Sequence, residues 1–186
     1  MKTYKYRIYP TKAQETILNK QLELCRWVYN KTLETRRNAF EQDGKSLSFY
    51  DTKKMLPIWK EEKPDLKSVH SMVLQDVTLR VDIAYQAFFR RVKTGEEKAG
   101  FPRFKGYGRY DSMTFPQYGN GARIDGNYLI LSKLGSVKVK FHRGLCGGAL
   151  WAQRRFVCVA RLQANGLLPS LARPMGTQIV RFSLPN

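Results

Sequence analysis

The sequence predicts an α+β protein in which a helical block is inserted between the first strand of a small antiparallel sheet or barrel and the remaining strands. Three observations predict it. Residues 3–9 alternate with the period of two of a half-buried strand, residues 12–93 contain two long apolar series with helical spacing, and residues 112–142 return to a period of two.

The first strand and the first helix are separated by a proline. Pro10 ends the strand, Thr11 and Gln14 match a capping box, and the apolar residues that follow recur at helical spacing. We therefore expect one helix over about 12–41, closed by Gly44.

The middle of the chain predicts a short helix and then a second long one. Pro57 and Pro64 interrupt the segment, which predicts a helix near 51–60 followed by a loop. Ser71 is the expected N-cap of a helix that runs to about Lys93. We assign its apolar stripe and several aromatic residues to packing: Val73, Val77, Ala84, Ala87, Phe88, Val92, Trp27, Tyr29 and Phe89.

The last patterned region predicts short strands joined by tight turns. SMTFPQY, NYLILS and SVKVKFH have strand character, and Gly-Asn-Gly, Asp-Gly-Asn and Gly-Ser separate them.

The charge of the chain requires a polyanionic partner. It has 33 Lys and Arg against 15 Asp and Glu, a formal net charge of +18. A hydrophobic content of 42% predicts that most of the chain folds. Nucleic acid is the first candidate partner and an anionic membrane the second, because such a field attracts phosphate.

The charge is unevenly distributed along the chain. Residues 1–143 hold 28 basic and 15 acidic residues, whereas 144–186 hold five Arg and no Lys, Asp or Glu. The composition therefore changes near Arg143.

Several classes of site are not indicated by the sequence. Three cysteines without a CxxC pair predict neither a disulfide framework nor a zinc site. The two histidines are isolated, and no P-loop, GxGxxG or GxSxG occurs. We predict no catalytic residue, no metal site and no small-molecule substrate. Without an apolar leader or an 18-residue apolar run, we expect a cytoplasmic protein that does not enter the membrane.

Basic and aromatic residues alternate after the second long helix. The run from Arg90 to Tyr110 interleaves Lys and Arg with Phe101, Phe104 and Tyr107. Such residues stack on bases beside phosphate-binding cations, although a solvated charged face remains the simpler interpretation of each cation.

Four segments resemble, in order, the N-terminal half of the TnpB (OrfB) proteins of insertion-sequence transposons. They are YKYRIYPTKAQETIL, CRWVYNKTLE, DIAYQAFFRRVKTGEEKAGFPRFKG and LSKLGSVKVKFHR, and the resemblance covers about residues 1–143. These proteins are regarded as compact RNA-guided DNA endonucleases and have long been called transposases.

The resemblance implies a domain arrangement. Residues 1–10 and 112–143 would form an incomplete wedge-type β-barrel, and 11–111 a helical, helix-turn-helix-like recognition domain with a basic and aromatic connector. In this family these domains hold a transposon-derived guide RNA and read a short motif in the double-stranded DNA beside the target.

The resemblance also implies what is missing. The family's nuclease is a following RuvC domain, in which three acidic residues bind two metal ions and a four-cysteine zinc element is inserted. Residues 144–186 contain no acidic residue, so we expect Mg²⁺ and structural Zn²⁺ only in the missing domain and none in this chain.

A shift of reading frame explains the change at Arg143. Residues 163–171 read QANGLLPSL, and when the last base of each codon is joined to the first two bases of the next, the codons permit Gly-Lys-Trp-Phe-Ala-Ser-Phe-Ser, which resembles a GKW-aromatic strand of the family. We predict that 144–186 are an out-of-frame tail without a fold; the alternative is a genuine Arg-rich extension.

The resemblance and the charge pattern supply the candidate site residues. Alignment on the family motifs places contacts to the target-adjacent duplex at Phe49, Lys53, Ser71, Met72, Gln75 and Gln117. Candidates for contact with an RNA or DNA backbone are Arg7, Lys12, Arg26, Arg90, Arg91, Arg103 and Lys105.

The leading hypothesis is a truncated TnpB-type protein that binds guide RNA and DNA without cleavage, in the cytoplasm and associated with the nucleoid. Three alternatives stay open: an active nuclease, a host RNA-binding basic protein, and a transposon regulatory fragment.

Overall fold

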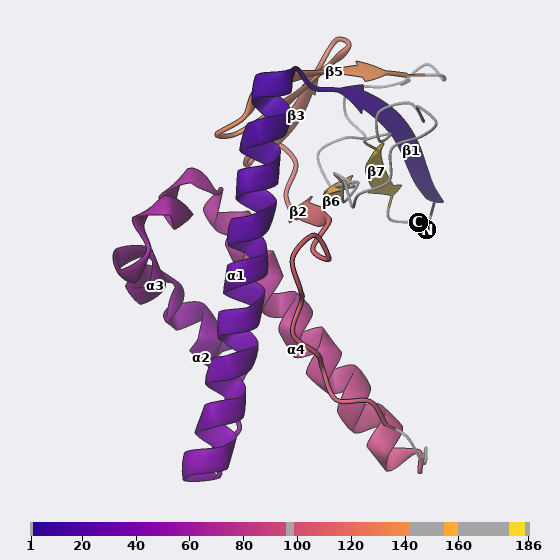
Figure 1. Cartoon of the computed structure of the whole chain (residues 1–186). Coiled ribbons are helices and arrows are strands. Elements are labelled where there is room, and N and C mark those ends of the chain that lie inside the picture. The colour runs from indigo at the N-terminus through magenta and orange to yellow at the C-terminus, as the bar shows by residue number, and fades with distance from the viewer. Residues whose placement is uncertain (1, 96–98, 142–154, 160–178, 185–186) are drawn as a thin grey trace, which may run out of the picture. The chain divides into compact units, whose positions relative to one another are not determined.

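The computed structural model describes residues 2–95, 99–141, 155–159 and 179–184 (Figure 1). Two compact units share the chain. One comprises Met1–Glu23 with Gly108–Asn186, and the other comprises Leu24–Tyr107. We describe each unit by itself.

The first unit contains an antiparallel sheet with the strand order β2-β6-β7-β1-β5-β4-β3. The sheet is open, because its edge strands β2 and β3 are not paired with each other in the described part of the chain. The strands are β1 (Lys2–Tyr9), β2 (Ser112–Phe115), β3 (Ala122–Asp125), β4 (Tyr128–Leu131), β5 (Gly135–Lys140), β6 (Arg155–Val159) and β7 (Ile179–Leu184).

Strand β1 lies inside the sheet and shows the predicted alternation. Tyr6 and Ile8 are each 3% exposed, whereas Arg7 between them faces solvent. Ile8 is opposite Val139 of β5, so the apolar residues of both strands share one face. The α+β class and the insertion of helices after the first strand are therefore confirmed.

The hairpin β3–β4 adds a strand that the sequence analysis missed. Asp125 is opposite Tyr128 across a turn in which Gly126 has φ of 52°. This positive φ is accessible to glycine without strain, and the turn pairs β3 along the whole of β4.

The expectation that 144–186 have no fold is corrected in two places. Strand β7 pairs with β1 from Lys2↔Leu184 to Arg7↔Ile179, and β6 pairs with β2 and β7. RFVCV and IVRFSL are rich in the β-branched and aromatic residues that favour strands, and they supply partners for otherwise unpaired edges. The reading frame of 144–186 stays a prediction.

Helix α1 (Lys12–Asp43) begins in the first unit and continues into the second. The capping box is confirmed: the Thr11 N–H donates to Gln14 Oε1 at 3.0 Å, and the Gln14 N–H donates to Thr11 Oγ1 at 3.3 Å. At the other end Gly44, with φ of 62°, donates its N–H to the Phe40 carbonyl at 3.0 Å. This left-handed C-cap ends the helix where the sequence predicts.

The predicted helix near 51–60 is instead two helices, α2 (Phe49–Lys54) and α3 (Leu56–Glu62), followed by the 3₁₀ helix η1 (Pro64–Ser68). Met55 ends α2 and begins α3. Pro57 lies in the first turn of α3, where its missing N–H costs nothing, but it could not continue α2.

Helix α4 (Ser71–Lys93) has the predicted length but a different start. Its N-cap is His70, so the prediction of Ser71 as the N-cap was wrong, and the Ser71 hydroxyl is left for another partner. The stripe assigned to packing is buried in its first half only: Val73 and Val77 are 1% exposed, whereas Val92 is 52% exposed.

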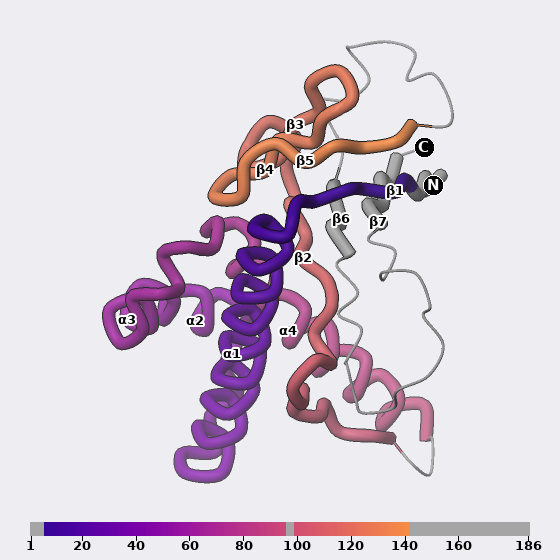
Figure 2. The backbone as a smooth tube through the Cα atoms, turned by 45° about the horizontal axis from the view of Figure 1, so that its top comes forward, coloured from indigo at the N-terminus to yellow at the C-terminus, as the bar shows by residue number. Residues whose placement is uncertain are grey.

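Figure 2 shows α2 and α3 beside α1, and β1, β5, β4 and β3 running side by side in the other unit. The core of the helical unit includes Leu33 of α1, Leu66 of η1 and Leu74 of α4, each at most 1% exposed. None of the described helices combines the length and apolarity that a membrane span requires.

Candidate nucleic-acid interface

A hollow of about 420 Å³ in the helical unit gathers three of the six residues predicted to contact the target-adjacent duplex. Lys53 reaches it from α2, and Ser71 and Gln75 reach it from the first turns of α4. Tyr50, Lys54 and Lys60 also line it. Residues from three separate helices thus meet in one basic, aromatic and amide-bearing surface, which we call the duplex groove.

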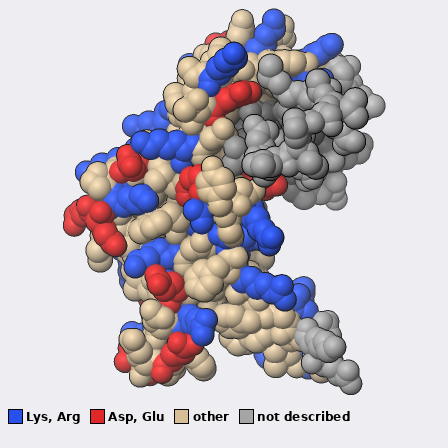
Figure 3. All heavy atoms as spheres, viewed as in Figure 1, with Lys and Arg blue, Asp and Glu red and all other residues tan. Residues whose placement is uncertain are grey.

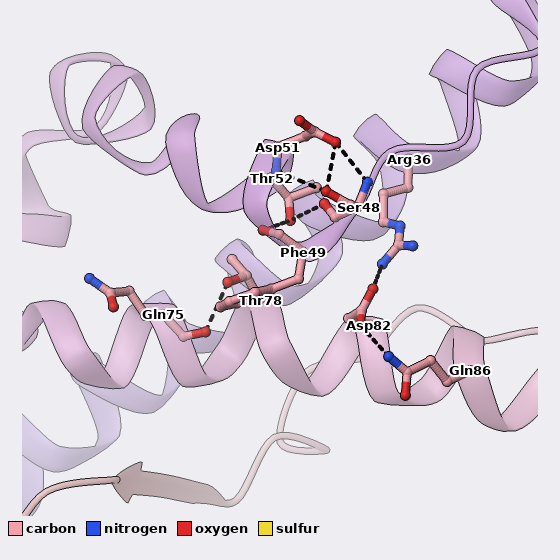
Figure 4. Close-up of polar contacts among 9 residues, drawn as sticks. All are labelled: Arg36, Ser48, Phe49, Asp51, Thr52, Gln75, Thr78, Asp82 and Gln86. Atoms are coloured by element: carbon pink, nitrogen blue, oxygen red, sulfur yellow. Dashed lines mark hydrogen bonds and ion pairs between the residues drawn. The ribbon is translucent and has the colours of Figure 1, made fainter.

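The N-terminus of α2 is fixed by a capping box that holds this helix in place (Figure 4). The Ser48 N–H and hydroxyl donate to Asp51 Oδ2 at 2.9 and 2.7 Å, and the Asp51 N–H donates back to Ser48 Oγ at 3.4 Å. The backbone and hydroxyl hydrogen bonds from Ser48 lower the pKa of the Asp51 carboxyl. Sequence-local chemistry therefore positions the six residues that carry Phe49 and Lys53.

Phe49 supports its neighbours and does not line the groove. Its half-buried ring meets Tyr50 edge to face at 5.4 Å between centroids, and the Lys53 ammonium lies 5.9 Å from its centroid. Tyr50 is 69% exposed and is the aromatic side chain that the groove offers. The sequence analysis did not predict Tyr50 as a site residue. The signal available for it was the segment FYDTKK, in which two adjacent aromatic residues are followed by two adjacent lysines.

The start of α4 presents Ser71 and Gln75 one helical turn apart, on one side of the helix. Lys60 Nζ donates to Ser71 Oγ at 3.0 Å, which ties α3 to α4. The Gln75 side chain extends away from the other residues of Figure 4, while its backbone carbonyl accepts from Thr78 Oγ1 at 2.8 Å. Met72 is half-buried and does not line the groove.

Gln117 belongs to the sheet unit and lies in the turn after β2. The Asn120 amide donates to its Oε1 at 3.2 Å. Because Gln117 and the residues of the duplex groove belong to different units, the contact of Gln117 with the target-adjacent duplex stays a prediction.

The connector at 99–107 is held against the helical unit by one asparagine and two arginines. Asn30 Nδ2 donates to the Lys105 carbonyl at 2.9 Å, and the Lys105 N–H donates to Asn30 Oδ1 at 2.8 Å. Arg26 donates to the same carbonyl at 3.3 Å, and Arg91 donates to the Gly100 carbonyl at 3.0 Å. Arg26 and Arg91, predicted as phosphate contacts, thus each commit a guanidinium donor to the connector backbone.

The ordered connector displays aromatic and basic side chains to solvent. Phe101, Phe104 and Tyr107 are 45%, 51% and 82% exposed. Arg90 and Arg103 are exposed, and the Lys105 ammonium lies 5.8 Å from the centroid of Tyr29. Their role in stacking on bases stays a prediction.

An aromatic cluster anchors the start of the connector. Phe101 meets Phe88 at 5.3 Å and Tyr85 at 5.4 Å, both edge to face. Phe88 therefore packs as predicted, but Phe89, also assigned to packing, is 49% exposed. The apolar residues at the end of α4 are therefore only partly buried: Phe88 contacts Phe101, whereas Phe89 and Val92 are exposed.

The remaining predicted cations lie in the sheet unit. Arg7 is on the exposed side of β1, and Lys12 is the exposed first residue of α1. Lys and Arg side chains predominate over acidic ones on the face shown in Figure 3. The seven predicted backbone contacts come from both units: Arg7 and Lys12 belong to the first, and the other five, from α1, α4 and the connector, belong to the helical unit.

Within the described residues, no three His, Cys, Asp or Glu side chains are grouped so that they could hold a metal ion. Burial raises the pKa of the Cys25 thiol to about 12, so this cysteine is a packed apolar group and not a nucleophile.

The sequence is similar to one family model and to several known proteins. Residues 1–45, which hold β1 and α1, match the family model HTH_OrfB_IS605, described as a helix-turn-helix domain. A protein from Escherichia coli K12 named "Putative RNA-guided DNA endonuclease InsQ" is 28% identical over 151 residues, 79% of this chain and 35% of that protein. A Streptomyces pristinaespiralis protein named "Putative RNA-guided DNA endonuclease" is 32% identical over 106 residues, 56% of this chain and 25% of that protein.

A third relative is short. The virulence protein VsdF of Salmonella dublin is 32% identical over 114 residues, which are 56% of this chain but 92% of VsdF.

The chain belongs to the TnpB (OrfB) family. It spans about a third or less of the two endonuclease relatives, so it corresponds to a segment of a TnpB protein.

Proposed function

We propose that this TnpB segment binds transposon-derived guide RNA and the double-stranded DNA next to the target, without cleaving either. In this proposal residues 1–10 and 112–143 correspond to the wedge-type barrel of the family and 11–111 to its recognition domain. The segment acts in the cytoplasm, at the nucleoid, because its ligands are there.

The duplex groove is the observation that supports duplex recognition most directly. Lys53, Ser71 and Gln75 were chosen on sequence grounds alone, and they converge with Tyr50, Lys54 and Lys60. Lysines attract the phosphate backbone, and a glutamine amide donates and accepts at the N6 and N7 atoms of adenine in the major groove. The groove thus offers both backbone attraction and a reader of base edges.

Binding without cleavage is supported by composition. The two-metal chemistry of the family needs acidic ligands, which 144–186 do not contain. We place the Mg²⁺ and Zn²⁺ of the family in its RuvC domain and not in residues 1–186. Incubation of the chain with Mg²⁺, guide RNA and target DNA should give no cleavage product; specific cutting would overturn this part of the proposal.

The out-of-frame origin of 144–186 is part of the proposal and has its own test. The nucleotide sequence beyond codon 143 should, in the neighbouring frame, continue into a RuvC domain with its acidic residues. A neighbouring frame interrupted by stop codons, or lacking those residues, would favour the Arg-rich extension.

A stand-alone regulatory fragment is the second candidate, and VsdF favours it. Because the alignment covers 92% of VsdF, a protein of little more than the aligned segment exists in Salmonella dublin. A regulatory fragment would compete with an intact TnpB for guide RNA or DNA. Addition of the chain to an intact TnpB from the same host should then inhibit cleavage, and no inhibition at saturating chain would argue against it.

Substitutions in the duplex groove test the central proposal. Lys53→Gln should lower the affinity for a duplex carrying the target-adjacent motif and reduce the slope of log K against log salt by about 0.9, the value for one lost phosphate contact. Gln75→Ala should leave that slope unchanged and reduce discrimination between motif and scrambled duplexes by about 1–3 kcal/mol.

Lys67→Gln is the matched control, because Lys67 is an exposed lysine of η1 outside the groove. Fluorescence anisotropy between about 50 and 200 mM salt measures all three variants. Equal effects of Lys53→Gln and Lys67→Gln would mean that the groove has no special part in binding.

A further inference from the structure

The register of the sheet creates a row of exposed side chains that the candidate site does not use. Tyr9 of β1 is opposite Lys138 of β5, and Lys138 is opposite Tyr128 of β4. In the next row Arg7 is opposite Lys140. Tyr9 and Tyr128 are 45% and 48% exposed, and both lysines face solvent.

Burial of the opposite face fixes this arrangement. Ile8, Leu129, Val137 and Val139 alternate with the exposed residues and are at most 3% exposed. Because side chains alternate along a strand, a slip of one residue would bury Lys138 and expose this apolar set. The order Tyr–Lys–Tyr across three strands is therefore a specified property of the fold.

The two tyrosines stand far enough apart to act separately. They lie on strands two inter-strand steps apart, a distance of about 10 Å, beyond the roughly 4.5–7 Å of a direct ring pair. Each ring therefore has room for a planar partner of its own, with Lys138 between the two.

A hollow of about 500 Å³ adjoins this row and adds an amide. It is lined by Tyr9, Asn127, Lys138, Lys140 and Phe141. The Asn127 carbonyl accepts from the Val139 N–H at 2.8 Å, which holds the backbone of Asn127, and the Phe141 ring meets the Tyr6 ring edge to face at 5.0 Å. The Asn127 amide can donate to and accept from a ribose 2′-hydroxyl.

We propose that this outer face of β1, β5 and β4 binds a single-stranded RNA segment, with unpaired bases stacked on Tyr9 and Tyr128 and the backbone held by Arg7, Lys138 and Lys140. The inference rests on the proposed nucleic-acid function and adds a second surface with a different mode of binding. Unpaired bases gain from an aromatic ring, whereas the bases of a duplex are already stacked inside it.

The charge on this face favours the same occupant. The strands β3, β4, β5 and β1 present Arg7, Arg123, Lys138 and Lys140 on this side, against one carboxylate, Asp125. A polyanion is attracted to four cations placed beside two aromatic rings, and an RNA strand supplies both the phosphates and the bases.

The full chain and a labelled, unstructured RNA of about 12 nucleotides test the proposal, a length within the range that single-strand binding surfaces cover. The double variant Tyr9→Thr/Tyr128→Thr keeps β-branched strand formers but removes both rings. It should weaken RNA binding by roughly 10- to 100-fold with an unchanged salt slope, because the phosphate contacts remain. The Tyr9→Phe/Tyr128→Phe variant should bind like the parent.

The lysines give the complementary result. Lys138→Gln/Lys140→Gln should lower the salt slope by about 1.4, twice the value of about 0.7 per phosphate for a single strand. Phe40→Leu is the matched aromatic control, since Phe40 is 64% exposed on α1 and far along the chain from the sheet; it should bind RNA normally.

Cross-linking decides the case in which the Thr variant does not fold. RNA that carries 4-thiouridine should cross-link the parent chain at peptides containing Tyr9 or Tyr128, as mapped by mass spectrometry. Cross-links confined to the connector, or full RNA affinity in a folded Thr variant, would overturn the proposal.

The results distinguish failure of this inference from failure of the proposed function. A parent chain that binds neither duplex nor RNA refutes both proposals. A parent chain that binds the duplex normally, together with a Thr variant that still binds RNA as the parent does, refutes this inference alone. Stronger binding to DNA of the same sequence would show that the surface prefers DNA and would also overturn it.

Discussion

The α1–α4 contact and the duplex groove use basic residues in opposite ways, although both belong to the helical unit. In the contact, Arg36 donates to Asp82 at 2.8 Å and lies 4.3 Å from the centroid of Tyr85. In the groove, Lys60 donates to a serine hydroxyl, and Lys53 lies over an aromatic ring. Arg36 is paired with a carboxylate inside the fold, whereas the half-buried Lys53 and Lys60 line a hollow that a ligand can enter.

The difference shows what the net charge of +18 measures. A cation paired with a buried carboxylate stabilises the contact only while both partners are present, because either alone would be an uncompensated buried charge. Exposed lysines contribute little to stability and are attracted to phosphate. The same formal charge is therefore paired inside the fold in one region and lines an open hollow in the other, and only the contacts of each side chain distinguish the two cases.

Removal of Asp82 should produce the largest effect. The side chains of Arg36 and Asp82 are 8% and 13% exposed, so Asp82→Ala leaves a buried guanidinium and also removes the acceptor of Gln86 at 2.7 Å. We expect the free energy of unfolding to fall by about 3–5 kcal/mol, measured by urea denaturation.

Glu41→Ala is the matched control for Asp82. The Arg37–Glu41 pair has the same chemistry at 2.7 Å, but its side chains are 53% and 54% exposed. Its loss should lower the free energy of unfolding far less than the loss of Asp82, because an exposed ion pair is solvated and screened by salt. Similar losses in the two variants would contradict the contrast between structural and available charge.

Loss of the connector clamp should have an intermediate effect. Asn30→Ala removes both side-chain hydrogen bonds to Lys105 and leaves a half-buried carbonyl and N–H with fewer partners. We expect a loss of about 1–3 kcal/mol and faster hydrogen exchange at 101–107, because these residues would no longer be held.

Asn38→Ala is the control on the same helix, since Asn38 is exposed. It should change neither stability nor exchange at the connector. If exchange at 101–107 did not respond to Asn30→Ala, the connector would be held by its aromatic anchor instead.

The long elements could be predicted from the sequence because their signals are local. The capping box at Thr11, the left-handed Gly44 and the alternation in β1 each lie within a few residues of the boundary they set. Strand β3 was missed because its four residues become a strand only by pairing with β4. The strands β6 and β7 were missed although their residues favour strands, because 144–186 were interpreted as an out-of-frame tail, and their partners lie far along the chain.

The residues of the candidate site also divide into those that the sequence predicts and those that only the packing of the helices brings together. Lys53, Ser71 and Gln75 followed from the family resemblance, but Tyr50 and Lys60 join them only through the packing of three helices. The attachment of Arg26 and Asn30 to the connector joins positions 75 or more apart, so no local pattern contains it. Sequence therefore identified cations without distinguishing those that hold the fold from those that remain accessible.

The capping box of α2 should give the smallest effect and connect stability to the groove. Ser48→Ala should cost about 1 kcal/mol at pH 7, whereas Ser46→Ala, two residues earlier, should cost almost nothing. The pKa of Asp51 is lowered in the folded state, so its carboxylate stabilises the fold at pH values above its unfolded pKa. That contribution is lost as the pH falls through the unfolded value and then the lower folded one. The difference in Tm between the parent and Ser48→Ala should therefore shrink between pH 7 and pH 3.

Because the cap positions the helix that carries Lys53, Ser48→Ala should also weaken duplex binding at pH 7. Unchanged binding would mean that α2 needs no cap to present Lys53.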